Sequence, residues 1–97
     1  MRIEGDTLYA KSAEPYYTSE RHGDKPNTVR LVNADEALLI LRWIRAARVD
    51  RDIEIRLAGG GEPLAWFRRT ITFIEMLEIP DVKLPPDHML MMICWRP

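Results

Sequence analysis

The segment HGDKPNTVRLVNADEALLILRWIR, residues 22–45, passes from turn residues to a strand pattern and then to a helix pattern. Its middle part, TVRLV, is β-branched and alternating, which predicts a strand over residues 28–32. On such a strand Thr28, Arg30 and Val32 share one face, because side chains alternate between the two sides. The fold is therefore expected to include a strand that carries a hydroxyl and a guanidinium on one side.

The clearest helix pattern begins directly after this strand. Asn33 is a favourable N-cap, and Glu36 stands three residues later, as in a capping box. Acidic residues come early and arginines late, as the helix dipole favours, so we expect a helix at about 34–48. One arc of this helix should face the core, while the opposite arc combines arginines with two leucines. The core-facing set is Leu39, Ile40, Trp43, Ile44, Ala46 and Ala47, and the opposite set is Leu38, Leu41, Arg42, Arg45 and Arg48.

A strand and a short helix are predicted before this segment. Residues 2–10 alternate loosely between apolar and polar side chains, which favours one strand. Pro15 suits a first helical turn, and Gly23 suits the position just past a helix end. We therefore expect a short helix from about Ala13 to Arg21.

Three more strands are predicted after the long helix. Residues 52–58 alternate, and the glycines at 59–61 suit a turn that leads into a long strand at 64–79. We expect that strand to bend or bulge midway, and to pair with the apolar run at 89–95, which suits a central strand. The order defines an α+β class: a small curved or barrel-like mixed sheet of about five strands with two helices, in a single domain over residues 1–97.

Composition limits the classes of function. The chain has 97 residues, of which 46% are hydrophobic and 30% are charged, values typical of a globular domain. The formal net charge is −1, so any binding of nucleic acid must come from a local patch. A single cysteine, Cys94, excludes an internal disulfide and favours a reducing compartment, so we expect a cytoplasmic protein. The N-terminus lacks the apolar run of a signal peptide, and no segment has the roughly 20 apolar residues of a membrane span.

The sequence offers no pattern for a metal or a cofactor. His22 and His88 have no neighbours at the spacing of metal ligands. The glycines at 59–61 lack the Lys-Ser/Thr continuation of a phosphate-binding loop. Neither a metal nor a cofactor is therefore expected.

The turn before the strand at 28–32 is the best candidate site. Lys25, Thr28 and Arg30 bring an ammonium, a hydroxyl and a guanidinium to one cleft, a group suited to an anion or a polarised carbonyl. A lysine held beside an arginine can also act as a base toward a threonine hydroxyl. The alternative is a turn followed by ordinary exposed charges on a strand.

These residues also form a recognisable motif. GDKPNTVR, residues 23–30, has the spacing G-x-K-x-x-T-x-R, which resembles the G-x-K-x-x-E-x-R signature of the ASCH domain family, a group with a PUA-like β-barrel fold. The resemblance implies a cleft that binds RNA, a nucleoside or a nucleotide. Within it, Lys25, Thr28 and Arg30 would line the cleft, and Gly23 would permit the turn.

Thr28 replaces the glutamate of the common signature. A branch of small ASCH proteins that deacetylate N4-acetylcytidine is similar at this motif, with threonine at this position. That resemblance implies amide hydrolysis with Thr28 as nucleophile, Lys25 as its activator and a glutamate farther along the chain. Glu75 and Glu78 are the glutamates in the corresponding stretch, and Glu78, near the predicted strand end, is the better candidate.

Three hypotheses follow. The first is a binding module for RNA, a nucleoside or a nucleotide, in which Trp66 or the pair Tyr16 and Tyr17 stacks on a base. The second is an amidohydrolase that uses Lys25, Thr28 and a carboxylate. The third is a non-catalytic interaction domain that docks a protein partner through the long helix. The residues of that docking face are Leu38, Leu41, Arg42 and Arg45.

Overall fold

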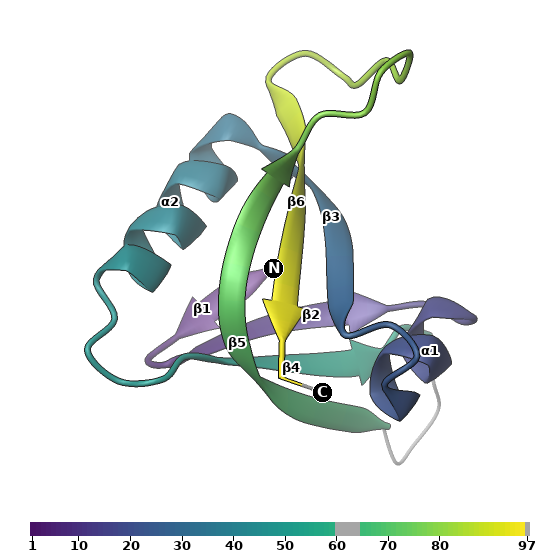
Figure 1. The fold of residues 1–97 in the computed structure, drawn as a ribbon, viewed down its shortest axis with the longest axis vertical. Coiled ribbons are helices and arrows are strands. Elements are labelled where there is room, and N and C mark those ends of the chain that lie inside the picture. The colour runs from purple at the N-terminus through teal and green to yellow at the C-terminus, as the bar shows by residue number, and fades with distance from the viewer. Residues whose placement is uncertain (60–64, 97) are drawn as a thin grey trace.

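The computed structural model describes residues 1–59 and 65–96. Within these residues the chain forms six strands and two helices (Figure 1). In chain order they are β1 (Arg2–Glu4), β2 (Thr7–Ser12), α1 (Tyr16–His22), β3 (Asn27–Asn33), α2 (Ala34–Arg45), β4 (Asp52–Leu57), β5 (Trp66–Leu77) and β6 (His88–Trp95).

The strands form one mixed sheet in the order β1-β2-β4-β5-β6-β3. Only β2 and β4 pair in parallel among the described strands, and the other pairs are antiparallel. The sheet curls into a half-barrel: β5 begins beside β4 and ends beside β6, so it belongs to both halves (Figure 1). The predicted α+β class, with a curved mixed sheet and two helices, is confirmed.

The bend of β5 has a local cause. Its pairing with β6 is irregular between Ile71 and Phe73, which is the signature of a β-bulge, and a bulge bends a strand. The prediction that the long strand bends or bulges midway is therefore confirmed. The predicted pairing with β6 is also present, and β6 lies between β5 and β3 as a central strand.

The prediction of one strand over residues 2–10 was wrong. The segment is a hairpin, with Ile3 opposite Leu8 and a turn at Gly5, whose φ of 57° lies in the left-handed region. Glycine adopts this conformation without steric cost, so Gly5 followed by Asp6 is a turn signal that the loose alternation concealed. The hairpin adds the sixth strand.

The core fills the concave side of the half-barrel. Leu8 and Ile53 are fully buried neighbours across β2 and β4, and Ile93 is fully buried on β6. Phe67 lies between Tyr17 and Trp95, with ring centroids 5.4 Å and 6.2 Å away. Each such side chain contributes about 1.5–3 kcal/mol through burial, so the aromatic contacts fix α1 against the sheet.

The long helix α2 starts as predicted. The side chain of Asn33 accepts a hydrogen bond of 2.8 Å from the backbone N–H of Glu36, which satisfies one of the free donors of the first turn. The helix ends at Arg45, three residues before the predicted end. Packing against β3 and β6 supplies the stability that a helix of this length lacks alone.

The face of α2 that meets the core includes Ile40, Trp43 and Ile44, as predicted, but it is rotated so that Leu41 takes the place of Leu39. Ala37 and Ile40 are buried and Leu41 packs against the core, whereas Leu39 is 61% exposed. The buried side follows the spacing i, i+3, i+4, but the wheel alone does not say which of two apolar arcs meets the sheet. Leu41 therefore does not belong to the predicted docking face, because it packs against the core. The other members, Leu38, Arg42 and Arg45, are exposed, and a protein partner for them stays a prediction.

The short helix α1 ends at Gly23, which has a φ of 84°, as the sequence predicts. Its first residue is Tyr16 rather than Ala13. The predicted glycine turn at 59–61 lies partly outside the described residues. Gly59 has a φ of 71°, and the pairing of Arg56 with Trp66 brings β4 and β5 together.

Cys94 lies on β6 with 8% of its surface exposed. Burial, and to a lesser extent the carboxylate of Glu75, raises the pKa of the Cys94 thiol, so little thiolate forms near neutral pH. We expect a disulfide reagent to label the native protein at least about tenfold more slowly than the urea-unfolded chain at the same pH. Equal labelling rates would contradict this assignment.

Candidate functional site

The motif residues lie where α1 turns into β3. Gly23 ends α1 in a left-handed conformation that side-chain-bearing residues rarely adopt, and this turns the chain toward the sheet. The backbone N–H of Lys25 donates to the carbonyl of Ser19, 3.2 Å away, which folds the turn back onto α1. The local sequence thereby holds Lys25 beside the first residues of β3.

β3 presents Thr28 and Arg30 to the concave side, as its alternation predicts. Thr28 is 2% exposed, whereas Val29, which faces the other way, is 37% exposed. A buried hydroxyl requires a hydrogen-bond partner, and Thr28 Oγ1 accepts one from Arg30 Nε at 3.0 Å. The two side chains are therefore positioned by each other as well as by the strand.

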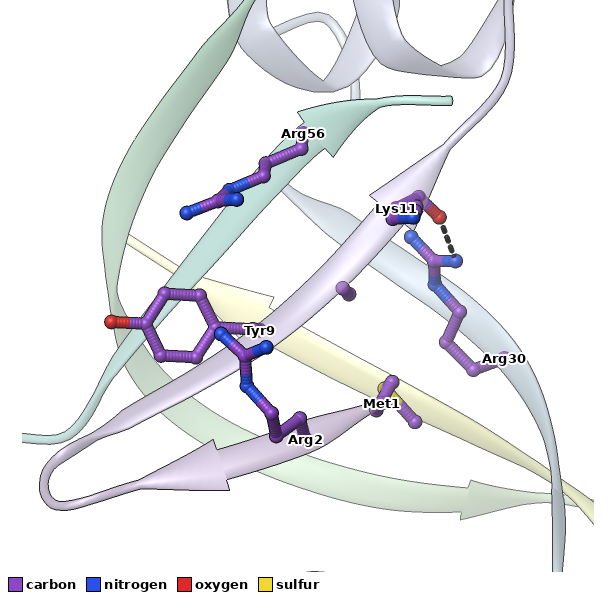
Figure 2. A pocket seen from close by; sticks show the side chains of 7 residues that line it. Met1, Arg2, Tyr9, Lys11, Arg30 and Arg56 are labelled. Atoms are coloured by element: carbon purple, nitrogen blue, oxygen red, sulfur yellow. Dashed lines mark hydrogen bonds between the residues drawn. The ribbon is translucent and has the colours of Figure 1, made fainter. Parts of the chain in front are cut away.

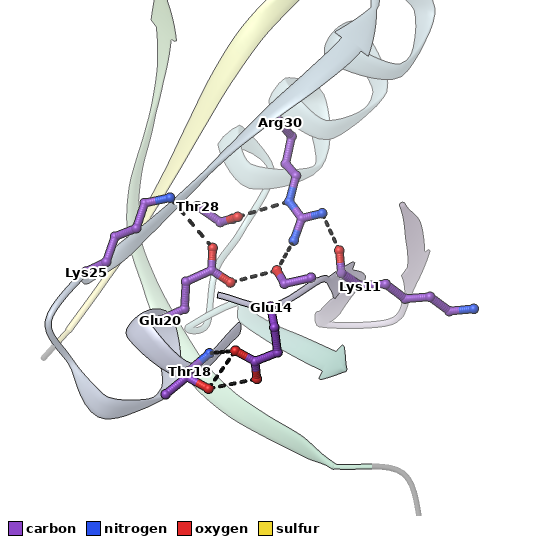
Figure 3. Close-up of polar contacts among 8 residues, drawn as sticks. Lys11, Glu14, Thr18, Glu20, Lys25, Thr28 and Arg30 are labelled. Carbon is purple, nitrogen blue, oxygen red and sulfur yellow. Dashed lines mark hydrogen bonds and ion pairs between the residues drawn. The ribbon is translucent and has the colours of Figure 1, made fainter. Parts of the chain in front are cut away.

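A pocket of about 300 Å³ opens between the end of β2, α1 and the start of β3. Among the side chains labelled in Figure 3, Lys11, Glu20, Lys25, Thr28 and Arg30 line this pocket. The lining residues with hydroxyl or charged side chains are Lys11, Ser12, Tyr16, Glu20, Lys25, Thr28 and Arg30. The structure thus gathers the predicted residues Lys25, Thr28 and Arg30 in one pocket.

Arg30 joins two strands that are not neighbours in the sheet. One terminal nitrogen donates to Ser12 Oγ at 2.5 Å, and the other donates to the backbone carbonyl of Lys11. β1 pairs with β2 only from Thr7 to Tyr9, so the last residues of β2 lie beyond its end. Arg30 therefore links β3 to the end of β2 (Figure 3). We call this junction between β2 and β3, which are not paired in the sheet, the seam of the half-barrel.

Glu20 supplies a carboxylate that the sequence analysis did not include. It projects from α1, is 1% exposed, and accepts a hydrogen bond of 2.6 Å from Ser12 Oγ. Its other oxygen lies 3.9 Å from Lys25 Nζ. The sequence held one signal for it: Glu20 is three residues after Tyr17, so both lie on the same, core-facing side of a short helix.

The pocket has an excess of positive charge. Burial lowers the pKa of the Arg30 guanidinium, and the opposing effect of Glu20 is smaller; an arginine stays charged at neutral pH nonetheless. Lys25 and Arg30 thus face one carboxylate, Glu20. The ring of Tyr16 is 60% exposed, with its centroid 5.3 Å from Lys25 Nζ. The arrangement suits a ligand with a flat ring and a carbonyl or an anionic group.

Glu78 does not lie in this pocket. It is exposed just beyond β5 and lines a separate hollow with Met89 and Leu90. Thr28 on β3 pairs with Ile93 on β6, and Ile93 pairs with Ile74 on β5. Glu78 is four residues beyond Ile74 in the chain, past the end of β5. The chain brings Glu20, not the predicted Glu78, to Thr28 and Lys25.

Glu75 and Trp66 are also remote from the pocket. Glu75 pairs with Met92, the partner of Val29, and is exposed. Trp66 starts β5 and is 53% exposed, opposite Arg56. The residues that line the pocket do not include Trp66.

Within residues 1–59 and 65–96, no three His, Cys, Asp or Glu side chains are gathered closely enough to hold a metal ion. Over that same part of the chain, no helix is long and apolar enough to cross a membrane.

Fold and site together define a small α+β half-barrel with a polar pocket at its seam. Comparison with family models, with curated proteins and with solved structures finds no match for this chain.

Proposed function

We propose that the pocket between β2, α1 and β3, called the seam pocket below, binds a nucleoside, a nucleotide or one nucleotide of an RNA. The resemblance to ASCH domains implies such a ligand. The observation that carries this proposal is the convergence of Lys25, Thr28 and Arg30 on one pocket of about 300 Å³. That volume is at the lower end for small-molecule sites, so a nucleoside-sized ligand suits it better than a larger one.

The pocket offers distinct partners for the parts of such a ligand. Arg30 has five N–H groups and donates three of them to Thr28, Ser12 and Lys11, which leaves two for a ligand oxygen. Lys25 suits a phosphate or a carbonyl, and Tyr16 suits stacking on a base. Glu20 has the acceptor oxygens that an exocyclic amino group requires.

Titration with the four ribonucleosides and their 5′-monophosphates tests this proposal. We expect the Lys25→Gln variant to bind the best of these ligands about tenfold more weakly, because a charged hydrogen bond contributes about 1.5–3 kcal/mol. Glutamine can still donate to Glu20, so the fold should persist. Lys83→Gln, in the exposed loop before β6, is the matched control and should bind normally. The proposal fails if no ligand of the panel binds, or if Lys25→Gln binds like the native protein.

A second function, amide hydrolysis, is favoured by one specific observation. A carboxylate does reach the Lys25 ammonium, at 3.9 Å, and it belongs to the buried Glu20. The group of residues needed beside Thr28 is then complete: a hydroxyl nucleophile, a lysine and a carboxylate. Arg30 Nε, which donates to Thr28 Oγ1, would stabilise negative charge that develops on that oxygen.

The reaction would proceed in two steps. The neutral amine of Lys25, positioned by Glu20, takes the Thr28 proton as Oγ1 attacks the carbonyl carbon of the acetyl amide. The C–N bond breaks, Lys25 returns the proton to the leaving nitrogen, and the acetyl group stays on Thr28 as an ester. Water then attacks the ester with Lys25 as base, which releases acetic acid and restores the hydroxyl. Release of cytidine and acetate from N4-acetylcytidine tests this function.

A further inference from the structure

Cations and aromatic rings line the outer face of the sheet next to the pocket. Two cross-strand rows run over β1, β2, β4 and β5, and residues directly opposite one another share a face of the sheet. The first row is Arg2, Tyr9, Glu54 and Arg68, and the second is Lys11, Arg56 and Trp66. We call the six cationic and aromatic members, Arg2, Tyr9, Lys11, Arg56, Trp66 and Arg68, the basic face.

Glu54 is the acid within these rows, and it is covered. It is 5% exposed, and Arg56 Nε and Arg68 each lie 3.0 Å from one of its oxygens. Both arginine side chains remain more than 40% exposed, at 43% and 44%. At the end of β1, Glu4 contacts Arg2, 3.2 Å away. The exposed side of the basic face is therefore cationic on a chain whose net charge is only −1.

Arginines flank the aromatic ring at the centre of this face. The Arg2 Cζ atom lies 4.7 Å and the Arg56 Cζ atom 5.8 Å from the centroid of the Tyr9 ring. Figure 2 shows Arg2 beside this ring. Trp66 adds a second ring, 53% exposed, beside Arg56. Aromatic rings among arginines are the groups on which unpaired bases stack while the phosphates contact cations.

The basic face is continuous with the seam pocket. A hollow of about 440 Å³ is lined by Arg2, Tyr9 and Arg56, together with Lys11 and Arg30 (Figure 2). Lys11 and Arg30 also line the seam pocket. An extended ligand can therefore pass from one hollow to the other without leaving the cationic surface.

We propose that a single-stranded nucleic acid lies across the basic face and places one nucleotide in the seam pocket. This inference rests on the proposed function, and it identifies the ligand as part of a strand rather than a free nucleoside. The bases of a duplex are stacked on one another, so their faces are not free to stack on the exposed ring of Trp66, and a single strand fits better. The face gives Trp66 a binding role outside the motif pocket.

Binding of fluorescently labelled eight-nucleotide strands, one of RNA and one of DNA, tests this inference, with a hairpin duplex as comparison. The variant Arg2→Gln/Trp66→Ala should bind the preferred strand about tenfold or more weakly, because a stacked base and a phosphate contact are lost. The slope of log affinity against log salt should fall by about 0.7 for the lost phosphate contact. Affinity for the mononucleotide should not change, because neither residue lines the seam pocket.

Lys83→Gln/Phe73→Ala is the matched control and should bind strands normally, since Phe73 is as exposed as Trp66, at 53%. The basic-face proposal is overturned if the native protein binds the duplex as tightly as either strand, or if Arg2→Gln/Trp66→Ala binds strands normally. If either result is found while the native protein still binds a mononucleotide, the basic-face proposal fails but the proposed function of the seam pocket stands. Strand binding that depends on Arg2 and Trp66 but not on Lys25, without mononucleotide binding, supports the face and contradicts the pocket.

Discussion

The Arg30→Ala variant is expected to unfold with a free energy about 3 kcal/mol lower than that of the native protein. Its guanidinium donates to Thr28 Oγ1, Ser12 Oγ and the Lys11 carbonyl. Alanine would leave Thr28, which is 2% exposed, without this donor, and would remove a positive charge from beside Glu20. Each charged hydrogen bond contributes about 1.5–3 kcal/mol. Residues at the seam can rearrange around the alanine, so the total loss of stability is smaller than the sum over the three hydrogen bonds of Arg30.

Urea denaturation followed by circular dichroism measures this effect. Arg30→Lys keeps the positive charge, but one ammonium cannot span three acceptors on two strands, so its loss of stability should be intermediate. Arg48→Ala, in the loop after α2, removes an exposed arginine and should change the stability by no more than about 0.5 kcal/mol. If Arg30→Ala is as stable as Arg48→Ala, the seam contacts do not hold the half-barrel together.

Arg30 thus has two roles in one side chain. It closes the seam between β2 and β3, and it lines both the pocket and the adjoining hollow. Weaker ligand binding by an Arg30 variant would therefore report on the fold as well as on the site. Lys25, whose described side-chain contacts are with Glu20 and the Tyr16 ring, is the better probe of binding.

Local periodicity was sufficient to predict most elements of the fold. The alternation of TVRLV gave the buried face of β3, and Asn33 gave the start of α2, because both depend on neighbouring residues alone. The rotation of α2 was not predictable in this way. Leu39 and Leu41 are equally apolar, and the curved sheet decides that Leu41 is the one that packs.

The residues of the site also divide into those that the local sequence predicts and those that only the folded sheet brings in. Lys25, Thr28 and Arg30 lie within six residues, so the turn and the strand alone bring them together. Ser12 and Glu20 reach them because the curled sheet places the end of β2 and α1 beside β3, although β2 and β3 are not neighbours in the sheet. The resemblance implies a carboxylate after the motif, such as Glu78, whereas the carboxylate in the pocket, Glu20, comes before the motif.

Thr28→Val is expected to lower acetate release from N4-acetylcytidine by at least about a thousandfold if Thr28 is the nucleophile. Valine has a similar shape but no hydroxyl, so the covalent step has no attacking oxygen. Arg30 Nε loses an acceptor, and we expect the free energy of unfolding to fall by about 1 kcal/mol. The variant therefore removes the chemistry while the pocket keeps its shape.

Thr28→Ser is the matched control. Serine retains the hydroxyl that accepts from Arg30 Nε, so it should keep substantial hydrolysis, whereas valine should not. Chromatographic measurement of cytidine, with the nucleoside titration performed on the same variants, separates the two functions. Absence of cytidine release by the native protein, together with ligand binding that weakens in Thr28→Val and returns in Thr28→Ser, assigns the hydroxyl to recognition alone. Undiminished release by Thr28→Val would show that another group attacks the carbonyl.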